Sequence, residues 1–570
     1  MKVLVEKDVY VPMRDGVRLA TDVYRLLDAP PAPVLVQRTP YSKEDAGLRD
    51  ASLDVMRAVV AGYAVVVQDV RGRYASEGEF MPFATEHTDG ADTIEWASGV
   101  SWSDGNVGLF GNSYYGATQW LAASESTLPK AMAPFLTASD LYDDWSYQDG
   151  AFRLGFSLYW ALLTLGPGDL RRRVAQGEAS PRQLGAALDA IDQAETLFGE
   201  SPLSAAAVHQ NVPAYYGEWL IHDVGDEYWT SKSAFRRRRA IRTPSLNIGG
   251  WHDIFLRGTL RNYRRMRELG VATRLVIGPW AHGNHTGVFA ERRFGARSSK
   301  LGVDVTGLTI SWFDEHLKGQ PQSTSEVSLF VMGADRWQDE ASWPPPDSVP
   351  TPLFLSSEGM KEGGNCAGTL SWQPAELLTA TSFDYDPRDP VPSTGGASFL
   401  PGLEVGANSG PRDQRPVEGR PDVLSYTSEP LDSPLTVIGP MDAIIFISSS
   451  AKDTDLVVTL TDVYPDGRSE LVCDGILRLS HREQAEVKMM IPNEIYQVRV
   501  DLIGTAMVFD AGHRLRVNVT SSCFPRFDRN LNTGEKPAEG KLSECVVATN
   551  CVYTGPTTVS RVVLPIVQRK

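Results

Sequence analysis

The sequence is short of the features that mark secreted and membrane proteins. Its 570 residues include only five cysteines, all between Cys366 and Cys551, and no CxxC pair. An odd number of cysteines confined to the last part of the chain argues against a disulfide framework and favours a reducing compartment. No charge-free apolar stretch reaches the length of about 18 residues that predicts a membrane-spanning helix. The N-terminus carries charges where a signal peptide needs its apolar region, so we expect a cytoplasmic protein.

The sequence also has fewer basic than acidic residues. Lysine and arginine number 55 against 71 acidic residues, which gives a net charge of −16. This balance argues against nucleic acid or an anionic membrane as a partner. Two arginine runs, at 171–173 and 236–239, are interpreted as solvated helix faces or salt-bridge partners. No His/Cys/Asp/Glu cluster has metal-ligand spacing and no glycine-rich phosphate loop occurs, so we expect no metal and no cofactor.

What the sequence does contain is a run of short apolar strands that alternate with helices. Strand-like runs at 34–38, 64–69 and 107–110 are typical of a parallel sheet covered on both faces. Residues 3–25 predict an antiparallel hairpin that leads into this sheet. From about 141 to 241 the pattern becomes helical, and strands resume at 245–250 and 274–278. A helical block between two halves of one sheet predicts a cap over an active site.

A serine lies where the strand predicted at 107–110 gives way to a helix predicted at 117–123. The stretch GNSYYG at 111–116 has glycine two residues before and three residues after Ser113. Small residues at these positions let a sharp strand-to-helix turn close, which is the setting of a nucleophile elbow. In such a turn the first N–H groups of the helix point to where an oxyanion forms. The motif alone is weak, and a serine in an ordinary β–α turn is the alternative.

The residues after the cap decide between these alternatives. Asp253 follows the strand at 246–250, and His282 follows the strand at 274–278, 29 residues further on. In α/β-hydrolases the order is serine, acid, histidine, each at the carboxyl end of a strand. The pattern therefore predicts Ser113 as the nucleophile, His282 as the general base and Asp253 as the residue that orients it.

Two other histidines adjoin this pair. His285 lies deeper in the loop after His282, and His252 directly precedes Asp253. Because neighbours on an extended chain alternate in direction, His252 is expected to face away from Asp253.

The predicted fold class is α/β, an α/β-hydrolase fold with an inserted helical cap and a C-terminal β jelly roll. Beyond about residue 350 the chain has short alternating strands, such as those at 455–460 and 515–519, many turns and little helix. We predict four segments. Residues 1–140 form the first part of the hydrolase domain, 141–241 the cap, 242–350 the second part of the hydrolase domain, and 351–570 the jelly roll.

Short motifs along nearly the whole chain resemble those of one family. They are VPMRDGV (11–17), VQDVRG (67–72), SEGEF (76–80), DGNVG (104–108), GPWAH (278–282), VLSYTS (423–428) and DRNLNTG (528–534), together with the elbow. On these motifs the chain resembles the bacterial cocaine esterase family, which is grouped with the X-Pro dipeptidyl peptidases. The resemblance implies the same three-part architecture. It also implies that the Tyr41 hydroxyl and the backbone N–H of Tyr114 form the oxyanion hole.

The resemblance further implies an aromatic acyl pocket between the cap and the jelly-roll boundary. By position its residues are Trp145, Trp160, Phe255, Phe399 and Leu400, with ordinary core packing as the alternative for each. The chain departs from the family at Phe399-Leu400, where the family has Leu-Phe, and over residues 42–53.

The sequence thus predicts a serine carboxylesterase. It would cleave small-molecule esters, aromatic acyl or benzoyl esters among them, through an acyl-enzyme on Ser113. One alternative is an amide hydrolase, either an acylase or an X-Pro dipeptidyl peptidase. The peptidase needs an acidic anchor for a substrate amine, and no residue can be assigned to that role from sequence. The candidates Asp143 and Asp144 in the cap are interpreted as solvated. Another alternative is a catalytically dead binding protein, which would have no reason to keep a complete triad. Relatives dimerise, so a homodimer is an open expectation.

Overall fold

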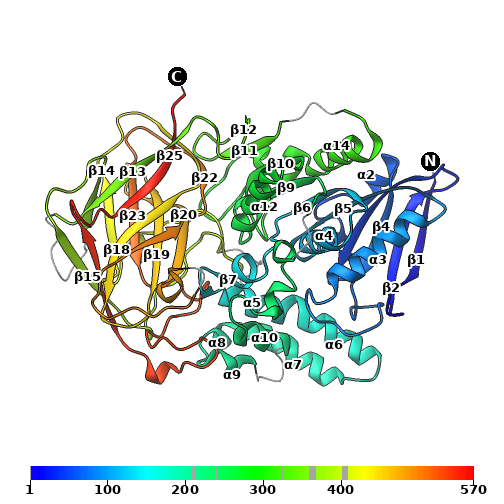
Figure 1. The fold of residues 1–570 in the computed structure, drawn as a ribbon, viewed down its shortest axis with the longest axis horizontal. Coiled ribbons are helices and arrows are strands. Elements are labelled where there is room, and N and C mark those ends of the chain that lie inside the picture. Colours follow the sequence, from blue (N-terminus) through cyan, green and yellow to red (C-terminus); the bar gives the residue numbers. More distant parts are fainter. Residues whose placement is uncertain are drawn as a thin grey trace.

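Two large sheets and a set of helices make up the molecule (Figure 1). The computed structural model describes residues 2–207, 213–237, 241–321, 325–358, 367–400, 408–483 and 486–569. Arg238 and Arg239 of the second arginine run, and Cys366, lie outside these ranges. The N-terminal sheet lies at the right of Figure 1, the C-terminal sheet at the left, and the inserted helices below and between them.

The first sheet has ten strands in the order β1-β2-β4-β3-β5-β6-β9-β10-β11-β12. Its seven parallel strands are β3 (Ala32–Thr39), β4 (Ala64–Asp69), β5 (Ser103–Asn112), β6 (Pro129–Phe135), β9 (Ser245–His252), β10 (Thr273–Ala281) and β11 (Val327–Val331). The antiparallel edge strands are β1 (Val3–Pro12), β2 (Arg18–Leu26) and β12 (Arg336–Glu340). The hairpin predicted at 3–25 is therefore present as β1 and β2.

Helices cover both faces of this sheet, as the continuous apolar strands predict. Val34 and Val36 of β3 belong to the same buried cluster as Trp120 of α4, whereas Leu35 belongs to the cluster that contains Phe313 of α14. The described helices that accompany this sheet outside the insertion are α1 (Ala46–Arg49), α2 (Val55–Val60), α3 (Glu86–Gly99), α4 (Ser113–Glu125), α12 (Leu256–Glu268), η4 (Ala296–Ser298), α13 (Lys300–Val303) and α14 (Val305–Lys318). Further along the chain are α15 (Arg415–Glu418), η5 (Leu479–His481) and η6 (Leu542–Glu544).

Helix α2 begins at Val55, where the Asp54 side chain accepts a hydrogen bond from the Arg57 N–H and caps the helix.

The helical insertion joins two neighbouring strands of the sheet. β6 and β9 pair in parallel, so the chain leaves the sheet after Phe135 and returns at Ser245. Its elements are η1 (Tyr142–Ser146), β7 (Tyr147–Gln148), β8 (Ala151–Phe152), α5 (Leu154–Trp160), η2 (Ala161–Leu165), α6 (Gly166–Ala175), α7 (Pro181–Asp192), α8 (Ala194–Phe198), α9 (Leu203–Ala207), α10 (Tyr215–Ile221), α11 (Glu227–Thr230) and η3 (Ala234–Arg236). The small β7–β8 hairpin was not predicted. Every helix among the described residues is too short or too polar to cross a bilayer.

The described parts of the arginine runs bind the insertion to the rest of the chain. Arg172 donates from Nη1 to the Gly72 carbonyl at 2.7 Å, and Arg237 pairs with Glu125 of α4 at 3.0 Å. The Arg237–Glu125 pair is a salt bridge of the kind predicted for these runs.

The C-terminal region is a β domain whose pairing is antiparallel except between β14 and β16. Its strands are β13 (Ser348–Ser356), β14 (Ala367–Ser371), β15 (Thr379–Tyr385), β16 (Leu424–Ser428), β17 (Leu435–Gly439), β18 (Asp442–Ser449), β19 (Asp455–Val463), β20 (Ser469–Arg478), β21 (Tyr496–Asp501), β22 (Thr505–Phe509), β23 (Arg514–Thr520), β24 (Ala548–Thr554) and β25 (Arg561–Val567). β13 already starts at Ser348, ahead of the boundary predicted at 350/351.

A buried arginine joins all three parts of the molecule. Arg257 on α12 is 2% exposed and donates to Asp149 of the insertion at 2.6 Å and to Asp501 of the β domain at 3.1 Å. A charge buried this deeply is tolerated only because carboxylates from both sides surround it. The contact fixes the position of the insertion against both sheets.

We predict that Arg257→Ala destabilises the protein by about 3–5 kcal/mol, because it leaves buried carboxylates without their counter-ion. The measurement is the midpoint of thermal unfolding. The matched control is Arg57→Ala, which removes the exposed Arg57–Asp304 pair (2.6 Å) and is expected to leave the midpoint nearly unchanged. Equal midpoints for the two variants would contradict the role given to Arg257.

Candidate active site

Ser113 lies at a sharp turn between β5 and α4. Its backbone is in the left-handed region, with φ of +53°, which is costly for a residue with a side chain. The two glycines of the motif make the turn possible. A Cβ on Gly111 would lie 2.6 Å from the Tyr115 carbonyl oxygen, and a Cβ on Gly116 would lie 2.7 Å from the Thr137 Cβ. The Thr137 hydroxyl, in the loop after β6, donates to the Ser113 carbonyl at 2.7 Å and holds the turn from that side.

The three predicted triad side chains meet at the carboxyl ends of β5, β9 and β10. Ser113 Oγ lies 2.9 Å from His282 Nε2, and His282 Nδ1 lies 2.8 Å from Asp253 Oδ1. Asp253 is 1% exposed, so its carboxylate faces His282 in a dry environment. With the Nδ1 proton directed at Asp253, Nε2 is free to accept the proton of Ser113.

The two neighbouring histidines lie outside this chain of hydrogen bonds. His252 packs against Phe289 and Phe294, and His285 Nε2 lies 3.2 Å from the His282 carbonyl. Burial lowers the pKa of each to about 3, so both imidazoles are neutral at physiological pH.

The Tyr41 hydroxyl reaches the nucleophile from the loop after β3. It accepts a hydrogen bond from Trp160 Nε1 at 2.9 Å and is within hydrogen-bonding reach of the Ser113 side chain. Burial raises the pKa of this phenol above its usual value, so it keeps the proton that it would donate. The Tyr114 N–H belongs to the first turn of α4, whose N–H groups have no partner within the helix.

A cavity of about 230 Å³ opens in front of Ser113. Its lining residues are Tyr41, Leu48, Asn112, Ser113, Tyr115, Phe156, Trp160, Leu163, Thr164, His282, Gly283 and Phe399. Apart from His282, none of these lining residues is a lysine, arginine, histidine, aspartate or glutamate. The cavity is therefore apolar and largely aromatic, with the nucleophile on one wall.

Two of the five predicted pocket residues, Trp160 and Phe399, line this cavity. The other three lie behind its wall. Trp145 stacks on Phe255 with ring centroids 4.2 Å apart, and Phe255 stands edge-on to His282 at 5.0 Å. Leu400 packs against Gly155 of α5. These residues support the cavity rather than form its surface.

Several lining residues were missed by sequence reasoning. Phe156 and Leu163 lie four residues before and three residues after the predicted Trp160 along α5 and η2, so this helical spacing could have identified them. Leu48 falls within residues 42–53, where the family resemblance is poor. Among the described residues, no cluster of His, Cys, Asp or Glu side chains is arranged to hold a metal ion.

Comparison with known proteins identifies the family of this chain. The X-Pro dipeptidyl-peptidase (S15 family) profile matches residues 15–284, and the profile of the X-Pro dipeptidyl-peptidase C-terminal non-catalytic domain matches residues 319–563. The cocaine esterase of Rhodococcus sp. (strain MB1 Bresler) is 41% identical over 99% of both chains. The chain belongs to the cocaine esterase family.

Solved structures agree with this membership of the cocaine esterase family. An α-amino acid ester hydrolase is 27% identical, with a TM-score of 0.80 over 99% of this chain and 96% of its own. An aminopeptidase from a marine sediment Thaumarchaeota archaeon is 26% identical, with a TM-score of 0.81 over 99% and 97%. The predicted α/β-hydrolase fold with its C-terminal β domain is confirmed, and the chain is a serine hydrolase.

We predict that Gly116→Ala slows labelling of the protein by a fluorophosphonate probe and lowers its thermal stability. The added Cβ has no room against Thr137, and overpacking of this kind costs about 1–3 kcal/mol. The control is Gly185→Ala in α7, where nothing lies within 4 Å of the new Cβ. Because alanine suits a helix interior better than glycine, Gly185→Ala is expected to keep or raise stability. Unchanged labelling of the Gly116 variant would show that the elbow tolerates the methyl group.

Proposed function

We propose that this protein hydrolyses small, uncharged carboxylic esters through an acyl-enzyme on Ser113. One observation carries the proposal. Ser113, which is linked through His282 to Asp253 by hydrogen bonds, faces an apolar, aromatic-walled cavity of about 230 Å³. Such a cavity is smaller than the roughly 300–1,000 Å³ typical of drug-sized ligands, which favours a compact acyl group.

Acylation begins with attack of Ser113 Oγ on the ester carbonyl carbon. His282 Nε2 takes the serine proton, and Asp253 holds the imidazole in the required tautomer and stabilises the imidazolium. The carbonyl oxygen becomes an oxyanion, which accepts hydrogen bonds from the Tyr41 hydroxyl and the Tyr114 N–H. When the tetrahedral intermediate collapses, the C–O bond to the alcohol breaks and His282 returns its proton to the leaving oxygen.

Deacylation repeats these steps with water. His282 removes a proton from the water as it attacks the acyl carbon, and the same two donors stabilise the second oxyanion. The bond to Ser113 Oγ then breaks, the serine regains a proton from His282, and the carboxylic acid leaves.

The cavity walls favour an aromatic or branched apolar acyl group. Phe156 and Trp160 stack on each other with centroids 5.5 Å apart, and Phe399 lies edge-on to His282 at 5.4 Å. These rings come from the insertion and from the β-domain boundary, so the acyl group would be held where three parts of the chain meet. That a related enzyme bears the name cocaine esterase supports an ester as the substrate.

The peptidase alternative lacks its anchor. An enzyme that binds a free α-amine needs a carboxylate near the scissile bond, and no described residue lining the cavity has one. The two candidates from the insertion are engaged elsewhere. Asp144 is buried rather than solvated and accepts from Arg261 at 3.0 Å, and Asp143 lies 3.6 Å from the same guanidinium. The matching S15 profile is that of a peptidase, so the experiment below includes peptidase substrates. The lack of a carboxylate among the described lining residues favours an ester. Cytoplasmic location and a homodimer stay predictions.

We predict that the wild type hydrolyses 4-nitrophenyl acetate, butyrate and benzoate, and that Ser113→Ala abolishes turnover. Asp253→Asn is expected to lower kcat by about 10⁴-fold, because the wrong imidazole tautomer then faces Ser113. The measurement is release of 4-nitrophenolate, with X-Pro anilides assayed in parallel. Faster turnover of the anilides than of every ester would reject the ester proposal and support the peptidase.

We predict that Tyr41→Phe lowers kcat for the preferred ester by about 10²–10³-fold, the usual cost of removing one oxyanion donor. Its KM should change little, because the phenol contributes mainly where negative charge develops in the transition state. Steady-state kinetics at saturating ester test this. A higher KM with unchanged kcat would instead make Tyr41 a residue that only binds substrate.

A further inference from the structure

We infer that the Tyr114 side chain is a positioning residue, which a buried Glu86–Arg38 ion pair holds so that the Tyr114 N–H stays aimed at the oxyanion. The inference rests on the proposed function and deepens it. The family resemblance implicates only the backbone N–H of Tyr114, and the inference adds a role for its side chain. It also gives a function to the Glu86–Arg38 ion pair, which lies away from the cavity.

Every part of the Tyr114 side chain is held. Its hydroxyl donates to Glu86 Oε1 at 2.8 Å and accepts from the Phe83 N–H at 3.0 Å. Its ring stacks on Phe83 with centroids 4.1 Å apart and planes inclined by 19°. The side chain is fully buried and does not line the cavity, so it cannot contact the substrate itself.

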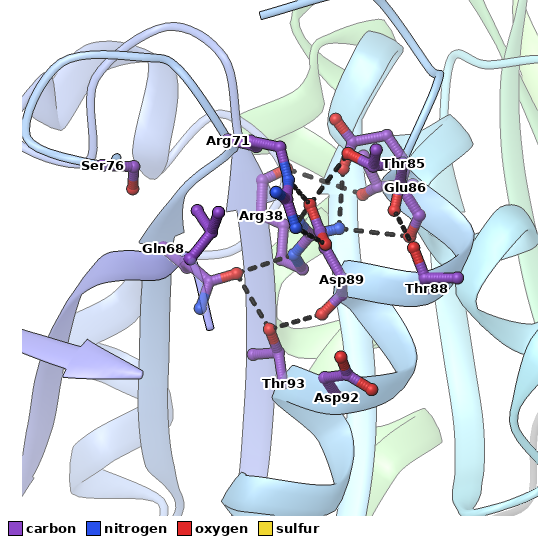
Figure 2. Close-up of polar contacts among 12 residues, drawn as sticks. Arg38, Gln68, Arg71, Ser76, Thr85, Glu86, Thr88, Asp89, Asp92 and Thr93 are labelled. Atoms are coloured by element: carbon purple, nitrogen blue, oxygen red, sulfur yellow. Dashed lines mark hydrogen bonds and ion pairs between the residues drawn. The ribbon is translucent and has the colours of Figure 1, made fainter. Parts of the chain in front are cut away.

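Glu86 is in turn fixed by the body of the sheet. Its second oxygen accepts from Arg38 Nη1 at 2.6 Å, and Arg38 Nε donates to Gln68 Oε1 at 2.7 Å. Figure 2 shows this cluster between the ends of two strands and the first turns of α3, where Thr93 also donates to Gln68, at 2.9 Å. Glu86 and Arg38 are 3% and 4% exposed. Tyr114 is thus tied to β3, β4 and α3 together.

The elbow needs such an anchor on its helical side. The left-handed backbone at Ser113 is strained, and relaxation of that residue would rotate the peptide that carries the Tyr114 N–H. Thr137 restrains the carbonyl of this peptide from one side of the turn. The Tyr114 side chain restrains the following Cα from the other side. Arg38 also lies on the strand that leads into Tyr41, so one buried pair supports both oxyanion donors.

The competing explanation is that the hydrogen bond from Tyr114 to Glu86 only stabilises the fold. The molecule offers a matched comparison in Tyr63, which is buried at the opposite, amino end of β4 and donates to Asp314 Oδ1 at 2.7 Å. Tyr63→Phe removes a similar tyrosine–carboxylate hydrogen bond without touching the active site. The two variants therefore separate loss of stability from loss of position.

The experiment compares wild type, Tyr114→Phe and Tyr63→Phe with 4-nitrophenyl benzoate as substrate. Inhibition by phenylboronic acid and by benzoate is measured on each. In the boronic acid adduct Ser113 Oγ bonds to boron, its proton passes to His282, and the resulting tetrahedral anion occupies the oxyanion hole. Benzoate binds without that geometry and reports on the pocket alone.

We expect Tyr114→Phe to lower kcat by about 10- to 100-fold, the scale of loss when a reacting group is misplaced by about 1 Å. The inhibition constant for phenylboronic acid should rise by a similar factor, while KM and the inhibition constant for benzoate stay within about twofold. Tyr63→Phe should change none of these four quantities. If Tyr114→Phe does not fold, Glu86→Gln, which keeps the shape of the carboxylate, should give a smaller loss in the same two quantities.

The proposal is overturned if Tyr114→Phe, or Glu86→Gln in its place, matches Tyr63→Phe in kcat and in boronate inhibition. It is also overturned if KM moves instead of kcat. Neither result bears on the proposed function, which is tested separately by the turnover of esters and X-Pro anilides by the wild type and by Ser113→Ala.

Discussion

The strained turn at Ser113 is the constraint on which the rest of the site depends. A left-handed backbone at a residue with a side chain persists only where its surroundings leave no alternative. Here Gly111 and Gly116 remove the atoms that would clash, and Thr137 and the anchored Tyr114 ring hold the two sides of the turn. The strain has a chemical purpose. It places the serine hydroxyl 2.9 Å from His282 Nε2, and in the proposed mechanism the Tyr114 N–H of the same turn donates to the oxyanion.

Sheet topology brings the remaining groups to that point. Ser113 and His282 are 169 residues apart, yet parallel strands end at the same edge of a sheet and so deliver their loops together. The same edge receives the insertion, because the chain departs and returns between the neighbouring strands β6 and β9. Closing the cavity from the insertion and the β domain requires rigid joints. Arg257 supplies one, and Arg73, which is buried and donates to the carbonyls of Pro40 and Leu165 at 2.8 Å, supplies another.

The parts of the fold and site that could be predicted are those whose sequence signal lies within a few neighbouring residues. Ser113, Asp253 and His282 could be found because each follows a strand, and strand ends are visible in a local pattern. The pocket was predicted less well. Trp145 and Phe255 lie close to the site in space, but sequence position does not say which ring forms a surface and which lies behind it. The link from Glu86 to Tyr114 could not be predicted at all. A buried glutamate in the first turn of a helix reads as an ordinary N-terminal acid, and only the fold shows that it receives a tyrosine hydroxyl 28 residues away.

The distribution of charge explains how one scaffold combines a reactive site with a tolerant pocket. The buried ionic groups, such as Arg38 with Glu86 and Arg257 with Asp149, lie in the joints between structural elements and outside the cavity wall. Directional pairs in a dry interior resist displacement, which suits parts that must not move. The cavity itself presents aromatic faces, which accept any apolar group of suitable size. Changes to Phe156 or Phe399 should therefore alter which acyl group is accepted while leaving the nucleophile in place, because Thr137 and the Tyr114 side chain, which hold the Ser113 turn, do not line the cavity.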